Sequence, residues 1–498
     1  MATRAPSSDP GGGSRREPGR RVWRTPALVF LVGLLAAAVV LAQGSSSRTP
    51  PAAAARAPSD GPTVPSRTNV SAAWYCAEGT STPDGRATES VIIGNLERHP
   101  IDVTVTVMPG GDEEPQSRQF SIDTLAQRRV EVANVLAAAE PGVVVEVFGG
   151  QAVVEHEVRR ADDFAIGPCT RKAEGTWFFT GVSTDRGAQE WLALFNPFGD
   201  DAIVDVSFLT ANGVDAPGET QALVVPRRSR VSLPVHDLVS REPDIAISVV
   251  ARTGRVVAEA STQFDGTDAR RGLALSPGVN EGARHWRFPS GTSTAGTTRA
   301  VSIANFGDVA AEVEVDVFLD NGSNVPPDRV TVSPMSITTV DVGQRIAAGV
   351  GYAIDVRALQ DTPVVVDATG AWAAPAPVTG VASTPGSVTT ATRWALALGR
   401  TTETDEAAIA VLNVGTAPVT VQLYAYTAGD PDSPRSAPAA AVAPGELVEF
   451  GLTERGIRPD QVLVVSADGP IVVGRQVLGT GVSVSAAVPF VRAVTRIR

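Results

Sequence analysis

The chain has 498 residues and a formal net charge of −12, and that length predicts three or four domains. The acidic surplus excludes nucleic-acid binding, because phosphate contacts depend on a basic patch that displaces counterions. Aromatic residues make up only 5% of the chain, while 47 glycines and 37 prolines indicate the many turns that an all-β chain requires.

The N-terminal segments predict an exported protein. Residues 1–24 are polar and carry six arginines, so we predict a disordered, basic, cytoplasmic head. The uncharged apolar run that follows predicts a single transmembrane anchor at residues 25–43. Arginines precede this run and none follows until Arg48, which places the bulk of the chain on the outer side of the cell membrane. The alternative is a cleaved signal peptide that leaves a secreted protein, because residues 40–42 fit a small-residue cleavage site.

Residues 44–70 are rich in proline, alanine and serine, and they predict an extended linker. Beyond this linker one pattern occurs four times. Each copy starts with a tryptophan, and an asparagine ends an apolar segment 19 to 21 residues later. The markers are Trp74, Trp177, Trp286 and Trp394, with Asn95, Asn196, Asn305 and Asn413. The tryptophans lie 103, 109 and 108 residues apart, which is the size of a domain. We therefore predict four domains, at 71–170, 171–279, 280–388 and 389–498.

The strand signals of the four copies align. An alternating apolar and polar segment follows each asparagine, as at 101–107 and 202–208. A glycine-containing turn comes next, for example Asn212-Gly213. Each copy then closes with two β-branched arms that read as a hairpin, such as 143–148 with 153–154. About seven strands in roughly 105 residues predict four tandem immunoglobulin- or fibronectin-like β-sandwiches after one N-terminal transmembrane helix.

Both cysteines lie in the first copy. Cys76 falls on its first predicted strand and Cys169 on its last, and these strands are often neighbours in such a sandwich. Export would place them in an oxidising compartment, so we predict a Cys76–Cys169 disulfide. Free thiols or a metal site are the alternatives, although two cysteines and four scattered histidines argue against a metal site.

The sequence contains no catalytic motif such as G-x-S-x-G, G-x-x-x-x-G-K-[ST] or H-E-x-x-H. The histidines occupy different positions in the copies and are expected on the surface or in packing roles. Acidic pairs such as Asp162-Asp163 are expected in solvated turns, with calcium between domains as the alternative. We therefore expect no enzymatic activity, no cofactor and no metal.

The repeated markers invite two interpretations each. The tryptophans could form a ligand platform, but their fixed position at the start of a strand favours the core or a domain junction. The asparagines end an apolar strand before a turn, where a side-chain amide can cap the loop backbone. We expect this structural role rather than recognition of a ligand.

The opening motif W-x-x-x-x-G-x-[ST], seen as Trp74-Tyr-Cys-Ala-Glu-Gly-Thr-Ser81, resembles a W-Y-x-A-E-G repeat of bacterial extracellular proteins. Together with the L-x-L-x-N strand, the basic head, the anchor and the linker, it resembles an uncharacterised actinobacterial family of membrane-anchored envelope proteins, a domain of unknown function. The resemblance covers residues 20–498. It implies a location in the cell envelope, and it carries over no functional residues.

From these observations we expect a non-catalytic, membrane-anchored extracytoplasmic scaffold, spacer or adhesion protein of the cell envelope, acting through protein–protein contacts. Four domains in a row would reach on the order of 150 Å if extended. The expected partners are the membrane, through the N-terminal helix, and envelope proteins or cell-wall glycan. The alternative is a module that binds peptidoglycan or polysaccharide, and a cluster of exposed aromatic residues on one domain would distinguish it.

Overall fold

The computed structural model describes residues 61–490, except 68, 112, 162, 324 and 400–404. These residues belong to one compact unit, Pro58–Arg498. The predicted head at 1–24, the predicted anchor at 25–43 and the first part of the predicted linker lie outside the described residues. Within the described ranges, no helix is long and apolar enough to cross a membrane.

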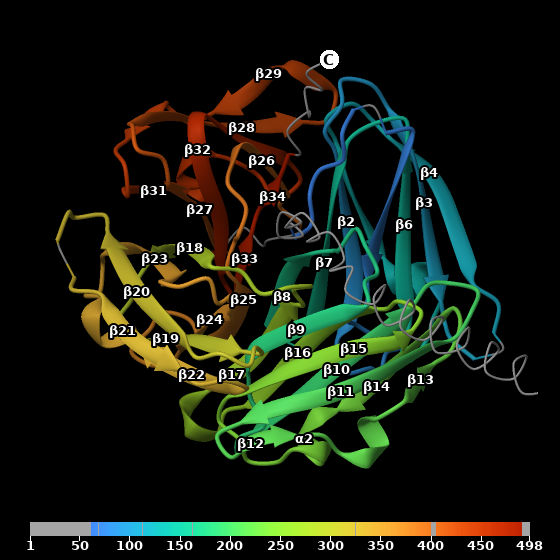
Figure 1. The fold of residues 1–498 in the computed structure, drawn as a ribbon. Coiled ribbons are helices and arrows are strands. Elements are labelled where there is room, and N and C mark those ends of the chain that lie inside the picture. Colours follow the sequence, from blue (N-terminus) through green and yellow to red (C-terminus); the bar gives the residue numbers. More distant parts are fainter. Residues whose placement is uncertain are drawn as a thin grey trace, which may run out of the picture. The chain divides into compact units, whose positions relative to one another are not determined.

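The described chain is almost entirely β-strand, and its strands pair antiparallel in several sheets, which confirms the all-β prediction (Figure 1). We call the four sequence copies repeats 1 to 4. Repeat 1 contains β1 Ser71–Cys76, β2 Thr88–Asn95, β3 Ile101–Met108, β4 Gln116–Ile122, β5 Gln127–Glu131, β6 Gly142–Phe148, β7 Ala152–Arg160 and β8 Asp163–Pro168. Its strands form two sheets, with the orders β1-β6-β3-β4 and β5-β2-β7-β8.

Repeats 2 and 3 follow the same plan. Repeat 2 contains β9 Thr176–Val182, β10 Ala188–Asn196, β11 Ala202–Thr210, β12 Gly213–Asp215, β13 Leu223–Val225, β14 Ser229–Pro234, the short helix α2 Val235–Leu238, β15 Ile245–Thr253, β16 Val257–Asp265 and β17 Arg271–Pro277. Repeat 3 contains β18 His285–Thr292, β19 Thr297–Asn305, β20 Ala311–Leu319, β21 Asp328–Val332, β22 Ser336–Asp341, β23 Gly351–Ala358, β24 Val365–Trp372 and β25 Gly380–Pro385.

Repeat 4 differs in one respect. It contains β26 Ala391–Ala397, β27 Glu406–Asn413, β28 Val419–Thr427, β29 Asp430–Ser436, β30 Ala440–Val442, β31 Leu447–Gly451, β32 Val462–Leu478, β33 Val482–Ala486 and β34 Val488–Pro489. The strand β32 runs unbroken through 17 residues and pairs with both β28 and β27. One strand therefore links what are separate sheets in the other repeats.

Alternation of side chains explains why each pair of sheets encloses a core. Along β3, Ile101, Val103, Val105 and Val107 are buried, and the polar residues between them face outward. Each sheet of this kind has one apolar face, and burying that face against a second sheet removes it from water. In repeat 2 the shared core takes Trp177 from one sheet and Leu192, among others, from the other.

The two closing arms of each repeat do not form the hairpin that the sequence predicts. In repeat 1, β6 belongs to one sheet and β7 to the other, and the arms of repeats 2 and 3 separate in the same way. Both arms are β-branched because each presents a buried face to the shared core. Residues 149–151 carry the chain from one sheet across to the other, so a short turn between two apolar strands does not by itself specify pairing.

Part of the predicted linker contacts the repeats instead of extending away from them. Val64 is fully buried, and its N–H donates to the carbonyl of Pro489 at 2.9 Å. Val64 also forms a parallel bridge with Phe490. The side chain of Gln151 donates to the carbonyl of Pro65, which fixes the same segment to repeat 1.

The predicted disulfide is confirmed. Cys76 ends β1, and Cys169 comes directly after β8 and bonds to Cys76 across a sequence separation of 93 residues. An isolated antiparallel bridge between Tyr75 and Thr170 brings the two segments together. The disulfide therefore joins the first strand of repeat 1 to the chain that leaves its last strand.

We predict that the change Cys76→Ala with Cys169→Ala lowers the free energy of unfolding by about 4 kcal/mol, because the long closed loop no longer restricts the unfolded chain. Urea unfolding of the full-length protein in detergent measures this difference. Without reductant, wild-type protein should release no thiol on denaturation. Two alkylatable thiols per chain would contradict the bridge.

Candidate functional site at the contacts between repeats

The four marker tryptophans are core residues in the structure, since each has at most 1% of its surface exposed. The indole N–H of Trp177 donates to the carbonyl of Val256 at 2.7 Å, and that of Trp394 donates to the carbonyl of Ile471 at 3.2 Å. These hydrogen bonds tie the first strand of a repeat to its second closing arm. Rings with no open face cannot form a ligand platform.

The four marker asparagines are also buried, and they make one recurring set of hydrogen bonds. The Asn305 Nδ2 group donates to the carbonyls of Val309 and Val332 at 2.8 and 3.1 Å, and its Oδ1 accepts the N–H of Gly307 at 3.0 Å. The side chains of Asn95, Asn196 and Asn413 make the corresponding contacts. One amide thus satisfies three backbone groups of the loop, which is a capping role.

Sequence reasoning missed a second recurring position, near the start of the second closing arm in each repeat. It is occupied by Glu155, Glu259, Asp367 and Gly474. The three acidic side chains are buried, and each lies against the first strand of another repeat or against its last. An acidic residue that directly follows two apolar residues at the same place in three repeats was the signal that could have identified this position.

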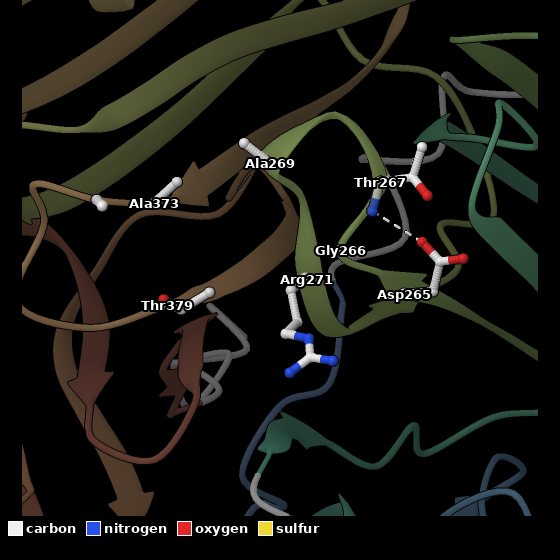
Figure 2. Close-up of a pocket in the computed structure, with 8 residues that line it drawn as sticks. Asp265, Gly266, Thr267, Ala269, Arg271, Ala373 and Thr379 are labelled. Atoms are coloured by element: carbon white, nitrogen blue, oxygen red, sulfur yellow. Dashed lines mark hydrogen bonds between the residues drawn. The ribbon is translucent and has the colours of Figure 1, made fainter.

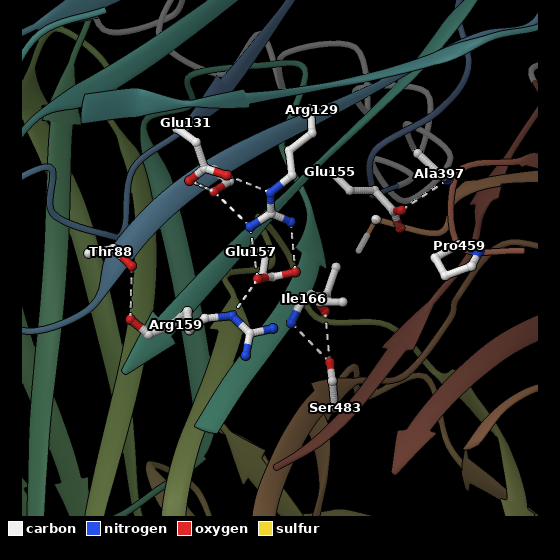
Figure 3. Close-up of polar contacts among 12 residues, drawn as sticks. Thr88, Arg129, Glu131, Glu155, Glu157, Arg159, Ile166, Ala397, Pro459 and Ser483 are labelled. Carbon is white, nitrogen blue, oxygen red and sulfur yellow. Dashed lines mark hydrogen bonds and ion pairs between the residues drawn. The ribbon is translucent and has the colours of Figure 1, made fainter. Parts of the chain in front are cut away.

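Repeat 1 contacts repeat 4 through the first of these acids (Figure 3). The Glu155 Oε2 atom accepts the N–H of Ala397 at 3.0 Å and a guanidinium N–H of Arg475 at 3.1 Å. Burial raises the pKa of Glu155, and the charge of Arg475 opposes that shift. Nearby, the Ser483 hydroxyl of repeat 4 accepts the N–H of Ile166 at 2.9 Å. The first and last repeats are therefore in direct contact, and the extended array considered from the sequence is not formed.

Repeat 2 contacts repeat 1 through a buried ionic cluster. The Glu259 Oε2 atom accepts the N–H groups of Ala77 and Glu78 at 2.8 and 2.7 Å. The His156 Nδ1 atom lies 3.1 Å from Glu89 Oε1, and its Nε2 atom lies 3.6 Å from Glu259 Oε2. Burial alone would lower the pKa of His156, but the charges of Glu259 and Glu89 outweigh it and raise that pKa. An imidazolium between two carboxylates has no free lone pair with which to act as a base or ligand.

A histidine and both cysteines come close together beside this cluster. One ligand atom each from Cys76, His156 and Cys169 lies within 4.8 Å of the others. The two sulfur atoms are joined in the disulfide, so neither is the thiolate that a zinc site uses. In the described structure this group does not fit a metal ion.

Repeat 3 contacts repeat 2 through Asp367, whose Oδ2 atom accepts the Ser276 hydroxyl at 2.9 Å. Burial raises the pKa of Asp367 to about 8. Repeat 4 has Gly474 at the corresponding place, and a Cβ atom added there would lie 2.5 Å from the carbonyl oxygen of Pro289 in repeat 3. The backbone of repeat 3 approaches too closely for any side chain, so glycine replaces the acid.

The strands that pair with the second closing arms of the four repeats also contact each other in cyclic order. The strand β17 contacts β8 and β25, and β33 contacts β25 and β8. Each contact joins different repeats, so these strands close the same cycle as the buried acids. The sequence has 104 to 108 residues between corresponding acidic positions, and that spacing does not reveal which repeats touch.

Asp163, at the start of β8, lies inside this cycle and not in the solvated turn that the sequence predicts. Its Oδ1 atom accepts the N–H of the next residue, Phe164, at 2.8 Å. Its Oδ2 atom accepts the N–H of Leu273 in repeat 2. It also accepts the N–H of Val482 in repeat 4. A Cβ atom added at Gly481 would lie 1.7 Å from Asp163 Oδ1, so the carboxylate fills space that a glycine leaves open.

The protein belongs to the Family of unknown function (DUF5719), whose model matches residues 164–437. No curated protein matches the chain. The crystal structure of Thermotoga maritima 1070 is 23% identical, covering 21% of this chain and 94% of that chain with a TM-score of 0.19. A Streptomyces avermitilis α-L-rhamnosidase complexed with L-rhamnose is 8% identical, covering 62% and 43%, with a TM-score of 0.14.

A third structure, the tetra-tandem repeat in the extending region of a large adhesion protein, is 12% identical. The match covers 80% of this chain and 94% of that chain with a TM-score of 0.10. TM-scores this low carry no argument about fold or activity. The prediction of a family of unknown function is confirmed.

We predict that Asn305→Ala lowers the free energy of unfolding by about 3 kcal/mol, because the buried carbonyl of Val332 and the partly buried carbonyl of Val309 and N–H of Gly307 lose their partner. Asn305→Asp should also destabilise, since a carboxylate cannot donate to the carbonyls of Val309 and Val332. Urea unfolding measures both changes. The exposed turn variant Asn321→Ala is the matched control, with an expected change within about 0.5 kcal/mol. Equal effects at positions 305 and 321 would refute the capping role.

Asp163 predicts a dependence of stability on pH. Burial raises the pKa of Asp163 from its ordinary 3.8 to about 7, against the opposing effect of three backbone N–H groups. The folded state therefore binds more protons than the unfolded state between these pH values, and the free energy of unfolding falls as the pH rises from about 4 to about 7. A side chain that cannot ionise should remove this contribution.

We accordingly expect Asp163→Asn to gain stability relative to wild type by on the order of 2 kcal/mol between pH 5 and pH 8. Urea unfolding at the two pH values gives the difference. The exposed loop variant Asp308→Asn should differ from wild type by the same amount at both values. If the Asp163→Asn difference is also independent of pH, the assignment of this titration to Asp163 is wrong.

Proposed function

We propose that the protein is a non-catalytic extracytoplasmic scaffold or adhesion protein of the cell envelope that acts through protein–protein contacts. The observation that supports this proposal is the cycle of contacts between repeats. The buried acids Glu155, Glu259 and Asp367 face backbone groups, hydroxyls or cations of another repeat. These buried carboxyl groups hold the repeats together, so they are not free for catalysis. The joined repeats present their outer sheet faces to solvent.

The proposal also covers the location of the protein in the cell and the fold of its repeats. Residues 25–43 anchor the chain as a single transmembrane helix, with the N-terminus in the cytoplasm and the repeats outside. Signal cleavage with release of a secreted protein is the alternative. Each repeat is an immunoglobulin- or fibronectin-like β-sandwich. Two antiparallel sheets that enclose a shared core in repeats 2 and 3 support this.

A compact platform fits the contacts better than a long spacer. The ion pair between Glu155 and Arg475 and the bridge between Val64 and Phe490 both join the start of the described chain to its end. Separating the repeats would leave the Glu155 carboxylate buried without its cation, or would expose it to water away from Arg475. We therefore favour binding on outer faces over mechanical extension.

The outer face of the β18-β23-β20-β21 sheet shows what such a platform offers. Arg329 lies 2.7 Å from Glu314, and His285 lies 2.5 Å from Asp355. Hydrogen bonds from Arg329 and Arg357 lower the pKa of Glu314, so this carboxylate is ionised at neutral pH. Alternating charges on an open sheet face suit a polar protein interface, where they determine the choice and orientation of the partner.

Binding to cell-wall glycan is the second candidate, and one observation favours it. Tyr424 and Tyr426 lie two residues apart on β28, so both point to the same face of the sheet. Their ring centroids are 6.4 Å apart, their planes differ by 26°, and both side chains are partly exposed. Two partly exposed aromatic rings on one sheet face present the kind of surface on which sugar rings stack.

One experiment separates the two candidates. The tagged full-length protein and its Tyr424→Ala/Tyr426→Ala variant are captured from mildly crosslinked envelopes, and bound material is identified by mass spectrometry. The scaffold function predicts stoichiometric recovery of one envelope protein with both chains. The glycan function predicts muropeptides or wall polysaccharide with the wild type and about tenfold less with the variant.

An untagged strain provides the background. A second control, Phe120→Ala, removes a partly exposed aromatic side chain from β4 of repeat 1, far in sequence from the tyrosine pair. This variant should recover the same glycan as wild type. Recovery of neither protein nor glycan above background would refute both candidates.

A further inference from the structure

An open pocket lies where repeat 2 meets repeat 3 (Figure 2). The turn between β16 and β17 forms one wall, and the loop between β24 and β25 forms the other. The cavity volume is about 570 Å³, which is within the range of small-molecule sites. The lining residues are Asp265, Gly266, Thr267, Ala269, Arg271, Ala373, Ala374 and Thr379.

Two opposite charges line this pocket without pairing with each other. Asp265 and Arg271 are direct partners in the register of β16 and β17. Nevertheless, among the ion pairs of the described residues none contains Arg271, and the Asp265 Oδ1 atom instead accepts the N–H of Thr267 at 2.8 Å. Both charged side chains are exposed at the mouth of the pocket. Figure 2 shows the Arg271 guanidinium pointing away from the Asp265 carboxylate.

The walls are already formed in the structure. Asp268 and Ala269 have positive φ values of 54° and 59°, a left-handed conformation that non-glycine residues adopt at a cost of about 1 kcal/mol or more each. On the other wall, the N–H of Ala373 donates to the carbonyl of Gly296 at 2.9 Å, and the N–H of Ala376 donates to the carbonyl of Ala373 at 2.8 Å. Strained residues of this kind concentrate at ligand-binding loops.

The charges of the pocket restrict its ligand. The N–H and hydroxyl of Thr267 lower the pKa of Asp265, so its carboxylate is ionised at neutral pH. An anion would be attracted by Arg271 and repelled by Asp265, and a simple cation would meet the reverse. A molecule that carries both charges satisfies both side chains. The methyl groups of Ala269, Ala373 and Ala374 leave room for small apolar substituents.

We propose that this pocket binds a small zwitterion, an α-amino acid or dipeptide with small side chains, with its carboxylate on Arg271 and its ammonium group on Asp265. The guanidinium offers a carboxylate two parallel N–H donors, and the hydroxyls of Thr267 and Thr379 supply further hydrogen bonds. The site is independent of the scaffold function, because it requires neither an envelope partner nor a glycan.

Dialanine is the probe, and its N-acetyl and C-terminal amide derivatives each lack one charge. Titration calorimetry of the full-length protein in detergent should show saturable binding of dialanine and binding of either derivative that is about tenfold or more weaker. Asp265→Asn should abolish the preference for the free ammonium group and retain the preference for the free carboxylate. Arg271→Gln should produce the reverse pattern.

Matched controls change the same residue types at exposed places away from the pocket. Asp215→Asn on β12 and Arg118→Gln on β4 should bind all three compounds as wild type does. Thr379→Trp fills the cavity while leaving both charges in place, and it should abolish binding of dialanine. This variant also decides the question if a change at Asp265 alters the turn.

Three results would overturn the proposal. They are no saturable binding of dialanine by wild type, equal binding of the three compounds, and full binding by the Thr379→Trp variant. The thermal unfolding midpoint of each variant, measured beside the wild type, verifies that the chain remains folded. Loss of binding only in unfolded variants would also count against the pocket.

Discussion

A buried carboxylate needs a partner, and this requirement explains how the repeats of the protein are joined. Glu155, Glu259 and Asp367 project from the second closing arm of their repeats into contacts that exclude water. An unpaired charge at such a place would cost several kcal/mol. Each carboxylate finds its partners on other repeats, at the backbone of a first strand, a hydroxyl or a guanidinium. Each of these side chains therefore gains a polar partner only when a particular neighbouring repeat is in place. Where repeat 4 has Gly474, direct backbone approach replaces the charge.

Closing the cycle of contacts gives repeat 1 a special position. It contacts repeat 2 through the His156 cluster and repeat 4 through Glu155, and it contains the disulfide of Cys76 and Cys169. Asp163 is also peculiar to repeat 1, since Gly272, Gly380 and Gly481 occupy the corresponding places in the other repeats. A single carboxylate that accepts N–H groups from repeats 1, 2 and 4 breaks the equivalence of the four copies. The four copies share one sequence pattern, but they differ in the residues through which they contact each other.

The surfaces left open differ in chemistry from the contacts between repeats. The buried contacts combine carboxylates with backbone groups. The open surfaces instead have ion pairs on repeat 3, an aromatic pair on repeat 4, and a pocket with separated charges between repeats 2 and 3. Each open feature lies on a rigid β framework, which holds its side chains in fixed relative positions. This division supports a protein that functions by binding. The proposed ligands differ accordingly, with a polar protein partner suited to the ion pairs, a glycan to the aromatic pair and a zwitterion to the pocket.

The sequence alone determined the local and periodic features, because these depend on neighbours along the chain. Alternating residues predicted the strand at 101–107, observed as β3, and the paired spacing of Trp and Asn predicted four similar copies. The position of Cys76 and Cys169 in one copy predicted their bond. The sequence did not determine which strands pair. The pattern of the arms β6 and β7 predicted a hairpin, yet these strands lie in opposite sheets. Apolar residues require a buried face but do not specify which sheet supplies it. The tertiary structure decided three features: the cycle of contacts, the role of Asp163 between repeats and the pocket at Asp265 and Arg271. Each feature brings together groups from distant parts of the chain. Their interaction energy depends on burial and geometry, which no spacing in the sequence encodes.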